Sequence, residues 1–285
     1  MTRFTSRALA AAAALALAAT ATAEARPVPD IPPPTDKPNL NMSRALLAAQ
    51  IDPARPDTAI TAGSKVAVIR IERLLRRRGL LARQFVDGHY GSSTKSAYSA
   101  FQQRLGYSGL AANGLPGIAS LTQLAGARFD ITGKVNVGPR VQLPGTPVIN
   151  RRTNRMKIAA AKLLRDCKWV VSQGSYNPGG DPTSAGTHDG GGVVDIHVEG
   201  MSADTRTAAA RALRQVGFAA WVRSPSQGQW PWHIHAVAIN DTDQATQAQN
   251  QVGDYYLGFN GLANHRPDDG PKVPIKTWED YQRAQ

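Results

Sequence analysis

The chain is nearly free of cysteine, with only Cys167 among its 285 residues. A single thiol cannot close an internal disulfide, so in an oxidising compartment the fold must rest on its hydrophobic core and on any bound metal. We interpret Cys167 as a small packed side chain rather than a nucleophile.

Acidic residues are also scarce, 21 against 33 lysines and arginines, which gives a formal net charge of +12. Such a cation is attracted to anionic wall polymers, lipid headgroups or nucleic acid. The sequence lacks a recognition helix, an aromatic RNA-binding signature and a basic amphipathic helix. We therefore expect peptidoglycan and anionic cell-wall polymers as partners, and no nucleic acid. A nucleic-acid binder driven by charge alone would instead show steep salt dependence and no preference for wall material.

Long hydrophobic runs are missing beyond the first 25 residues. Residues 1–25 open with two arginines, continue through an alanine- and leucine-rich stretch and end in small residues, which is typical of a secretory signal peptide cleaved after Ala23 or Ala25. A transmembrane anchor would need about 20 apolar residues. We expect a secreted monomer without a membrane anchor, extracellular or associated with the cell wall.

Proline and glycine mark the predicted boundaries. Eight prolines between residues 26 and 63 predict a semi-rigid linker, interrupted by one short helix around 42–50. Residues 131–150 are rich in glycine, proline and polar side chains and predict a second linker. Residues 266–285 are expected to form a C-terminal tail that specifies no function.

Between residues 64 and 130 the apolar residues recur at helical spacing. One helix should begin near Ser64 and end at Gly79, and a second should follow the turn 87–91. A third, shorter helix should follow 113–117. The inner stripe of the second helix is expected to contain Thr94, Ala97, Tyr98, Phe101 and Leu105. The prediction is a small all-α three-helix bundle.

This helical segment resembles the peptidoglycan-binding domain that accompanies many wall hydrolases. The matching residues are Asp87, Gly88, His89, Tyr90, Gly91, Thr94, Phe101, Gln102, Leu105, Gly106, Asn113, Gly114, Gly117, Ser120 and Leu124. The resemblance implies binding to glycan or stem peptide rather than chemistry. The candidate wall contacts are Asp87, Tyr90, Phe101 and Gln102.

Residues 151–265 predict a second domain of a different class. Helices are expected over 155–166 and 202–216, and strands over 168–172 and 218–222. With the two histidine-containing strands described next, these elements predict an α+β domain with a small antiparallel sheet.

Four of the six histidines lie in two short segments. In the first, 187–197, three glycines separate His188 from a strand-like stretch that ends in Asp195-Ile-His197. Side chains alternate along a strand, so Asp195 and His197 should share one face while the residues between them enter the core. The glycines allow the chain to bring His188 back beside them.

The second segment, 232–239, again predicts a strand, and it places His233 and His235 on one face. Imidazole nitrogens together with a carboxylate suit zinc, and a catalytic zinc site uses three protein ligands and a water. Ordinary surface or core histidines are the alternative.

These residues resemble the D-alanyl-D-alanine carboxypeptidase and Hedgehog-type zinc peptidases. His188, Gly191 and Asp195 match the first metal motif of that group, and His233-Ile-His235 resembles its closing His-x-His. The resemblance implies that His188, Asp195 and His235 are Zn²⁺ ligands and that His233 is a nearby acid or base, or a substrate contact.

Three positions depart from that pattern. Family members place a carboxylate three or six residues before the last ligand, where this chain has Trp232 and Gln229. Carboxypeptidase members also carry an arginine that grips the substrate carboxylate, and the run 172–177 has a serine at its place. The candidates for the missing base are His233, which we favour, His197, Asp189 and Glu199.

The sequence thus predicts a multidomain protein, an all-α bundle followed by a zinc peptidase-like α+β domain. Its expected activity is hydrolysis of stem-peptide amides in the cell wall. The competing hypothesis is a catalytically silent wall-binding protein whose metal site is structural or vestigial.

Overall fold

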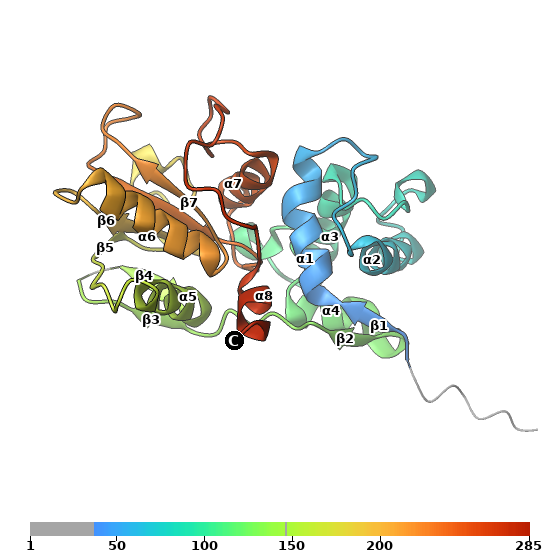
Figure 1. Cartoon of the computed structure of the whole chain (residues 1–285). Coiled ribbons are helices and arrows are strands. Elements are labelled where there is room, and N and C mark those ends of the chain that lie inside the picture. The colour runs from blue at the N-terminus through green and yellow to red at the C-terminus, as the bar shows by residue number, and fades with distance from the viewer. Residues whose placement is uncertain (1–36, 146) are drawn as a thin grey trace, which may run out of the picture. The chain divides into compact units, whose positions relative to one another are not determined.

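The structure, a computed structural model, describes residues 37–145 and 147–285, which belong to one compact unit from Lys37 to Gln285 (Figure 1). The predicted signal peptide and the first part of the proline-rich segment lie outside the described residues. Within the described residues, no helix has the length and apolar character needed to cross a bilayer.

The N-terminal part of this unit is helical. It contains α1 (Met42–Ile51), α2 (Lys65–Arg77), α3 (Ser92–Arg104) and α4 (Ile118–Ala125). The last three confirm the three predicted helices, and their apolar stripes meet in one core around Ile71, Tyr98 and Leu121. Leu105 was wrongly expected in this stripe. It caps the C-terminus of α3 and is 37% exposed, because the helix ends before its side chain can turn inward.

Residues 39–54 belong to the core rather than to a tether. Strand β1 (Asn39–Asn41) pairs in parallel with β2 (Asp130–Thr132), and Asn41 caps α1 by accepting a hydrogen bond from the Arg44 amide. Most of α1 is buried, and the helical turn η1 (Asp52–Ala54) follows it. The stretch between Pro38 and Pro53 contains no proline and is mostly apolar, which explains why it folds.

The second expected linker also holds regular structure. Strands β3 (Arg140–Gln142) and β4 (Val148–Asn150) form an antiparallel pair. The Asn150 side chain then accepts a hydrogen bond from the Thr153 amide and caps α5 (Arg151–Lys162). The glycines and prolines of this segment thus bound a hairpin, not an unstructured connection.

The C-terminal part is built on a four-stranded antiparallel sheet, which confirms the predicted mixed α+β class. The strands are β5 (Val171–Gln173), β6 (Val193–His197), β7 (Phe218–Arg223) and β8 (His233–Ala238), in the order β5-β6-β8-β7. Between β6 and β7, Ser202 caps α6 (Ala203–Gln215), as the sequence predicted.

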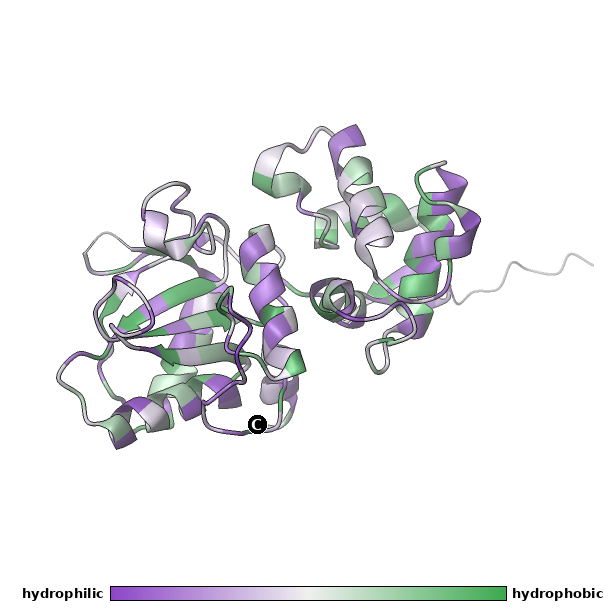
Figure 2. Cartoon of the chain, turned by 90° about the horizontal axis from the view of Figure 1, so that it is seen from above, coloured by the Kyte–Doolittle hydropathy of each residue, from purple (hydrophilic) through white to green (hydrophobic). Residues whose placement is uncertain are grey.

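The two faces of this sheet have different partners. Val194, Ile196 and Ile234 pack against α5 and α6, so the alternation expected along 193–197 is confirmed. On the opposite face, Val193 and Trp221 pack against α1 and α7 (Thr246–Leu257). Apolar strands between polar helix surfaces are visible in Figure 2. The final helix, α8 (Trp278–Arg283), closes the first of these cores through Trp278.

Candidate metal centre

The register of the sheet places the site residues in rows. Asp195 lies opposite His235 on β8, and His235 lies opposite Trp221 on β7. Two residues further along, in a second row, His197 lies opposite His233, and His233 lies opposite Arg223. Because side chains alternate, both rows belong to the face that carries α1 and α7. The indole of Trp221 stacks on the His235 imidazole, with ring centroids 6.4 Å apart.

His188 reaches this face from the glycine-rich turn before β6. A Cβ atom at Gly190 would lie 2.4 Å from the Ala245 amide nitrogen, so only glycine allows that close backbone approach. The turn is held at its other side by hydrogen bonds from the Tyr176 amide to the Gly190 carbonyl and from the Asn177 amide to the His188 carbonyl. These constraints fix His188 in a fully buried position.

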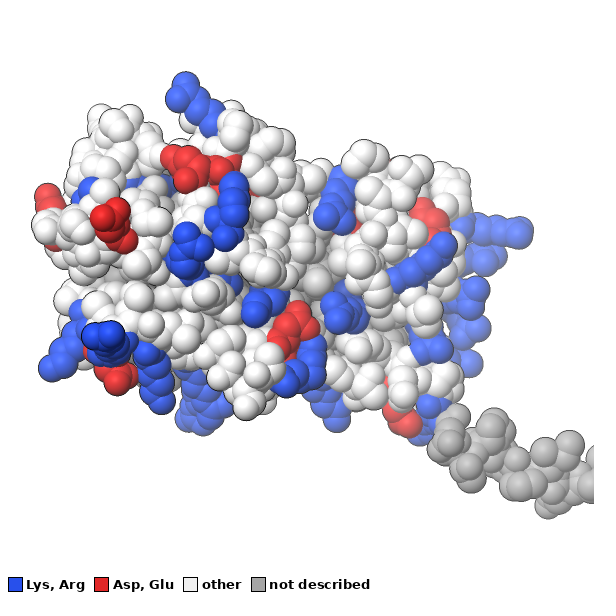
Figure 3. Space-filling view, viewed as in Figure 1, with Lys and Arg blue, Asp and Glu red and all other residues white. Residues whose placement is uncertain are grey.

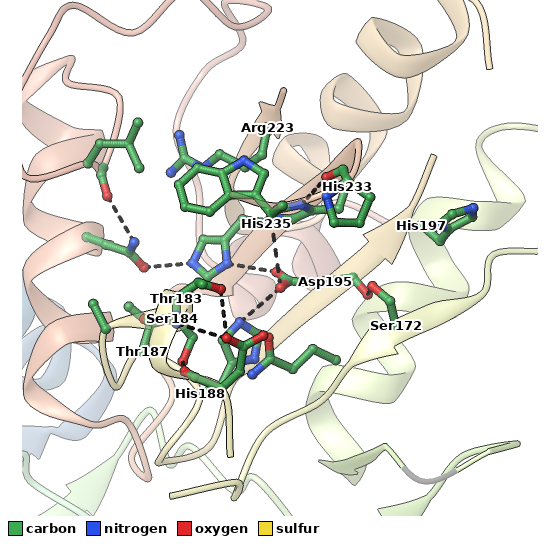
Figure 4. Close-up of a pocket in the computed structure, with 18 of the residues that line it drawn as sticks. Ser172, Thr183, Ser184, Thr187, His188, Asp195, His197, Arg223, His233 and His235 are labelled. Carbon is green, nitrogen blue, oxygen red and sulfur yellow. Dashed lines mark hydrogen bonds and ion pairs between the residues drawn. The ribbon is translucent and has the colours of Figure 1, made fainter. Parts of the chain in front are cut away.

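The structure brings together the three residues that the sequence singled out as metal ligands. One candidate ligand atom from each of His188, Asp195 and His235 lies within 4.8 Å of the others (Figure 4). His188 Nε2 is 3.3 Å from Asp195 Oδ2, and His235 Nδ1 is 2.8 Å from Asp195 Oδ1. All three side chains are buried, so the cluster could hold a metal ion.

The outer nitrogens of the two histidines determine which tautomers are present. His188 Nδ1 lies 2.7 Å from the Gly174 carbonyl oxygen, which can only accept, so Nδ1 carries the hydrogen. His235 Nε2 likewise donates to Gln251 Oε1 at 2.8 Å. In the neutral forms, the inner nitrogens His188 Nε2 and His235 Nδ1 therefore present lone pairs to Asp195. Two lone pairs facing a carboxylate are mutually repulsive unless a cation lies among them, and outer hydrogen bonds of this kind orient metal-binding histidines.

In the absence of a metal, a protonated histidine donates from its inner nitrogen to Asp195 instead, and the pKa shifts describe this state. Burial would raise the pKa of Asp195, but the charges and hydrogen bonds of His188 and His235 hold it far below its usual range. Burial lowers the pKa of His188, and Asp195 more than reverses that effect. For His235 burial prevails and the pKa falls. Asp195 is thus an ionised buried carboxylate, the form in which it could bind a cation.

His188, Asp195 and His235, called the triad from here on, line a cleft of about 270 Å³. His233 lines it, donating from Nδ1 to the Pro231 carbonyl at 2.9 Å and leaving Nε2 3.9 Å from Asp195 Oδ2. His197 is exposed at the rim, apart from the cluster (Figure 4). Asp189 and Glu199 do not line the cleft. Of the four base candidates, only His233 lies beside the triad.

Four further residues of this site were missed by sequence analysis. Gln251 orients His235, Trp221 stacks on it, and Asp181 and Arg223 line the cleft. The alternation of β7 could have placed Trp221 and Arg223 on one face, but nothing in the sequence identifies that face as the metal side. Gln251 and Asp181 carry no local signal at all.

The candidate wall contacts in the helical part are mostly internal. Tyr90 is fully buried and donates to the Gly114 carbonyl, and Phe101 is 4% exposed. Gln102 bonds at both ends of its amide, to the Leu115 carbonyl and the Gly114 amide. Asp87 alone is exposed. The motif around these residues thus stabilises the bundle, and three of the four side chains are not free to contact a polymer.

No protein family model, curated protein or solved structure matches this chain. The geometry of the cleft therefore carries the functional conclusion.

Proposed function

We propose that this chain is a secreted, zinc-dependent hydrolase that cleaves stem-peptide amides of peptidoglycan. The observation that supports the proposal is the buried cluster of His188, Asp195 and His235, in which Gly174 and Gln251 bind the outer nitrogens of the two histidines. Three buried ligands of this kind beside an open cleft are the donor set of catalytic zinc sites, in which further positions are left to water and substrate.

A bound zinc ion would lower the pKa of a water and polarise the amide carbonyl. His233 supplies the proton transfer: its Nδ1 is tied to Pro231, so Nε2 is free to take a proton from the attacking water and return it to the leaving amine. A positioned base of this type contributes about 10²- to 10⁴-fold to the rate. Asp181, the other cleft carboxylate besides Asp195, is the competing base.

The wall as partner is supported by charge and by the helical part. Lysine and arginine side chains outnumber acidic ones on the face viewed in Figure 3. Together with the net charge of +12, they favour association with anionic polymers. The helical part resembles peptidoglycan-binding domains and would concentrate the cleft on its substrate.

A catalytically silent wall-binding protein is the second candidate. It is favoured by Trp232 and Gln229, which occupy the places where the resembling families carry a catalytic carboxylate. In this case a bound metal would stabilise the turn 187–192 and the sheet, and would not catalyse hydrolysis.

The deciding experiment combines zinc titration with mass spectrometry of peptides released from purified peptidoglycan. The function predicts one zinc per chain and release that a chelator and His188→Ala abolish. His265→Ala, a histidine outside the cleft with a 59% exposed side chain, is the matched control and should leave release intact. Zinc binding without release, with protein sedimenting alongside the wall, would establish the silent binder. No zinc binding would rule out the hydrolase, and sedimentation with the wall in that case would establish a binder whose metal site is vestigial.

A further inference from the structure

The cleft beside the triad is lined by residues with buried polar atoms that have no hydrogen-bond partner inside the protein. Eight buried side-chain polar atoms of the described residues lack a hydrogen bond, and four belong to residues lining this cleft. One is His188 Nε2, which the metal would use. The others are N–H groups, on Gln173, Trp230 and Arg223. A buried donor without an acceptor costs stability, so the cleft is suited to a ligand rich in oxygen acceptors.

Arg223 is the charged member of this group. It lies on β7 opposite His233 and two residues after Trp221, so its side chain shares the face that carries the triad. In Figure 4 it lies on the side of the cleft where His233 and His235 are found. It is 3% exposed, and it is the only lysine or arginine among the residues that line the cleft.

The guanidinium group is held in place at one end and lacks a hydrogen-bond partner at the other. Nη1 donates to the Asn260 carbonyl at 2.8 Å, and the group lies 5.1 Å from the centre of the Trp221 ring. Nη2 has no hydrogen-bond partner, and no carboxylate of the described residues forms an ion pair with Arg223. Burial lowers the pKa of Arg223 to about 10, which leaves it charged at neutral pH. The charges of Asp195, Asp268 and Asp269 favour the charged form of Arg223, but none of these carboxylates pairs with it directly, so a direct anionic partner is left to a ligand.

We propose that Arg223 binds a carboxylate of the substrate beside His233 and His235, so that the preferred substrates are peptides with a free carboxylate close to the cleaved amide. Its planar fork of N–H groups matches the two oxygens of a carboxylate. The cleavage rests on the proposed function, but the carboxylate binding does not.

The carboxylate can come from the C-terminus of a peptide or from an acidic side chain. Three probes separate these sources: N-acetyl-D-alanyl-D-alanine, its C-terminal amide, and N-acetyl-D-glutamyl-D-alanine amide. Calorimetric titration of the full chain, with and without zinc, measures their affinities. At least one acid should bind on the order of 10- to 100-fold more tightly than the uncharged amide.

Variants connect this preference to one side chain. Arg223→Gln should bring the ratio of affinities close to one, Arg223→Lys should reduce it partly, and Arg211→Gln, an exposed arginine of α6, should preserve it. Zinc affinity, measured in the same samples, should not fall in Arg223→Gln, because the variant removes a positive charge that acts on Asp195 and His235. If that variant does not fold, the acid and amide probes on the unaltered chain still decide.

Equal affinities of acid and amide for the unaltered chain would overturn the proposal, as would a preference that persists in Arg223→Gln. A chain that binds no zinc but prefers the acid would refute the metal-dependent function and retain the role of Arg223.

Discussion

The helical part and the sheet part both bury carboxylates, and two of these, Glu72 and Asp195, have opposite kinds of partner. Glu72 on α2 is fully buried and accepts hydrogen bonds from the Asp87 and Gly88 amides and from the Thr94 hydroxyl. Asp195 on β6 faces two imidazole nitrogens instead. The first carboxylate is surrounded by donors of the turn it organises, whereas the second is surrounded by groups that can give up their protons.

The difference appears in their ionisation. Burial raises the pKa of Glu72 to about 7, because the backbone hydrogen bonds only partly offset the loss of water. The two histidines hold the pKa of Asp195 far below its usual range despite burial. Partners, rather than burial itself, thus separate a carboxylate that stabilises a turn from one that could bind a metal.

A matched pair of amide substitutions tests this difference most strongly. Asp195→Asn removes the charged ligand, so zinc affinity should fall on the order of 10³-fold. Glu72→Gln should leave zinc affinity unchanged. Competition with a chromogenic chelator measures both, and equal losses would show that the carboxylate of Asp195 has no special role.

A second pair compares two glutamines. Gln251→Ala removes the acceptor that orients His235, and loss of such a contact weakens metal binding about 10- to 100-fold. Gln102→Ala breaks two hydrogen bonds inside the helical part, and should lower the free energy of unfolding by about 1–3 kcal/mol without affecting zinc. Denaturant unfolding and chelator competition on both variants measure these two effects. A loss of zinc affinity in Gln102→Ala and a loss of stability alone in Gln251→Ala would contradict the comparison.

The raised pKa of Glu72 gives a pH dependence with a definite sign. Between about pH 4.5 and 7 the folded state binds more protons at Glu72 than the unfolded state, so stability falls as pH rises through this window. For the parent chain this loss of stability amounts to about 3 kcal/mol between pH 4.5 and pH 8. Glu72→Gln should abolish it, so the variant should match the parent near pH 4.5 and be more stable than the parent at pH 8. Urea midpoints at both pH values measure it, and a constant difference would refute it.

The smallest effect is expected at the end of α3. Leu105 is 37% exposed, so Leu105→Ser should change the free energy of unfolding by less than about 0.5 kcal/mol. Phe101→Ala, one turn earlier and 4% exposed, should cost about 3–5 kcal/mol. A large loss of unfolding free energy in Leu105→Ser would mean that Leu105 belongs to the core stripe that the sequence predicted.

Local periodicity was sufficient for much of the fold. The helical spacing around Ile71 and Tyr98 predicted α2 and α3, and strand alternation predicted which face of β6 carries Asp195. The ligand set His188, Asp195 and His235, which the structure brings together, came instead from the resemblance to zinc peptidases. The periodic signals lie within a few residues of one another, where chain geometry alone fixes which side chains share a face.

What the sequence did not predict depends on contacts between distant segments. Gln251 meets His235 only because α7 crosses the sheet, and Arg223 enters the cleft only because β7 pairs with β8. Composition also misled: prolines on both sides of 39–51 suggested a tether. The short helix expected around 42–50 does form as α1, but it is buried in the core.

Helix α1 has a consequence for how the protein can be divided. Its Leu46 belongs to the core of the helical part, while Leu47 and Ile51 pack in the same cluster as Trp221, the residue stacked on His235. Gln50 adds hydrogen bonds to Asn240 and Gln244. A recombinant fragment beginning near residue 150 would therefore leave this surface uncovered and the support of His235 incomplete. The helical part and the sheet part are not interchangeable modules, and a swap between proteins would have to carry α1 with the sheet.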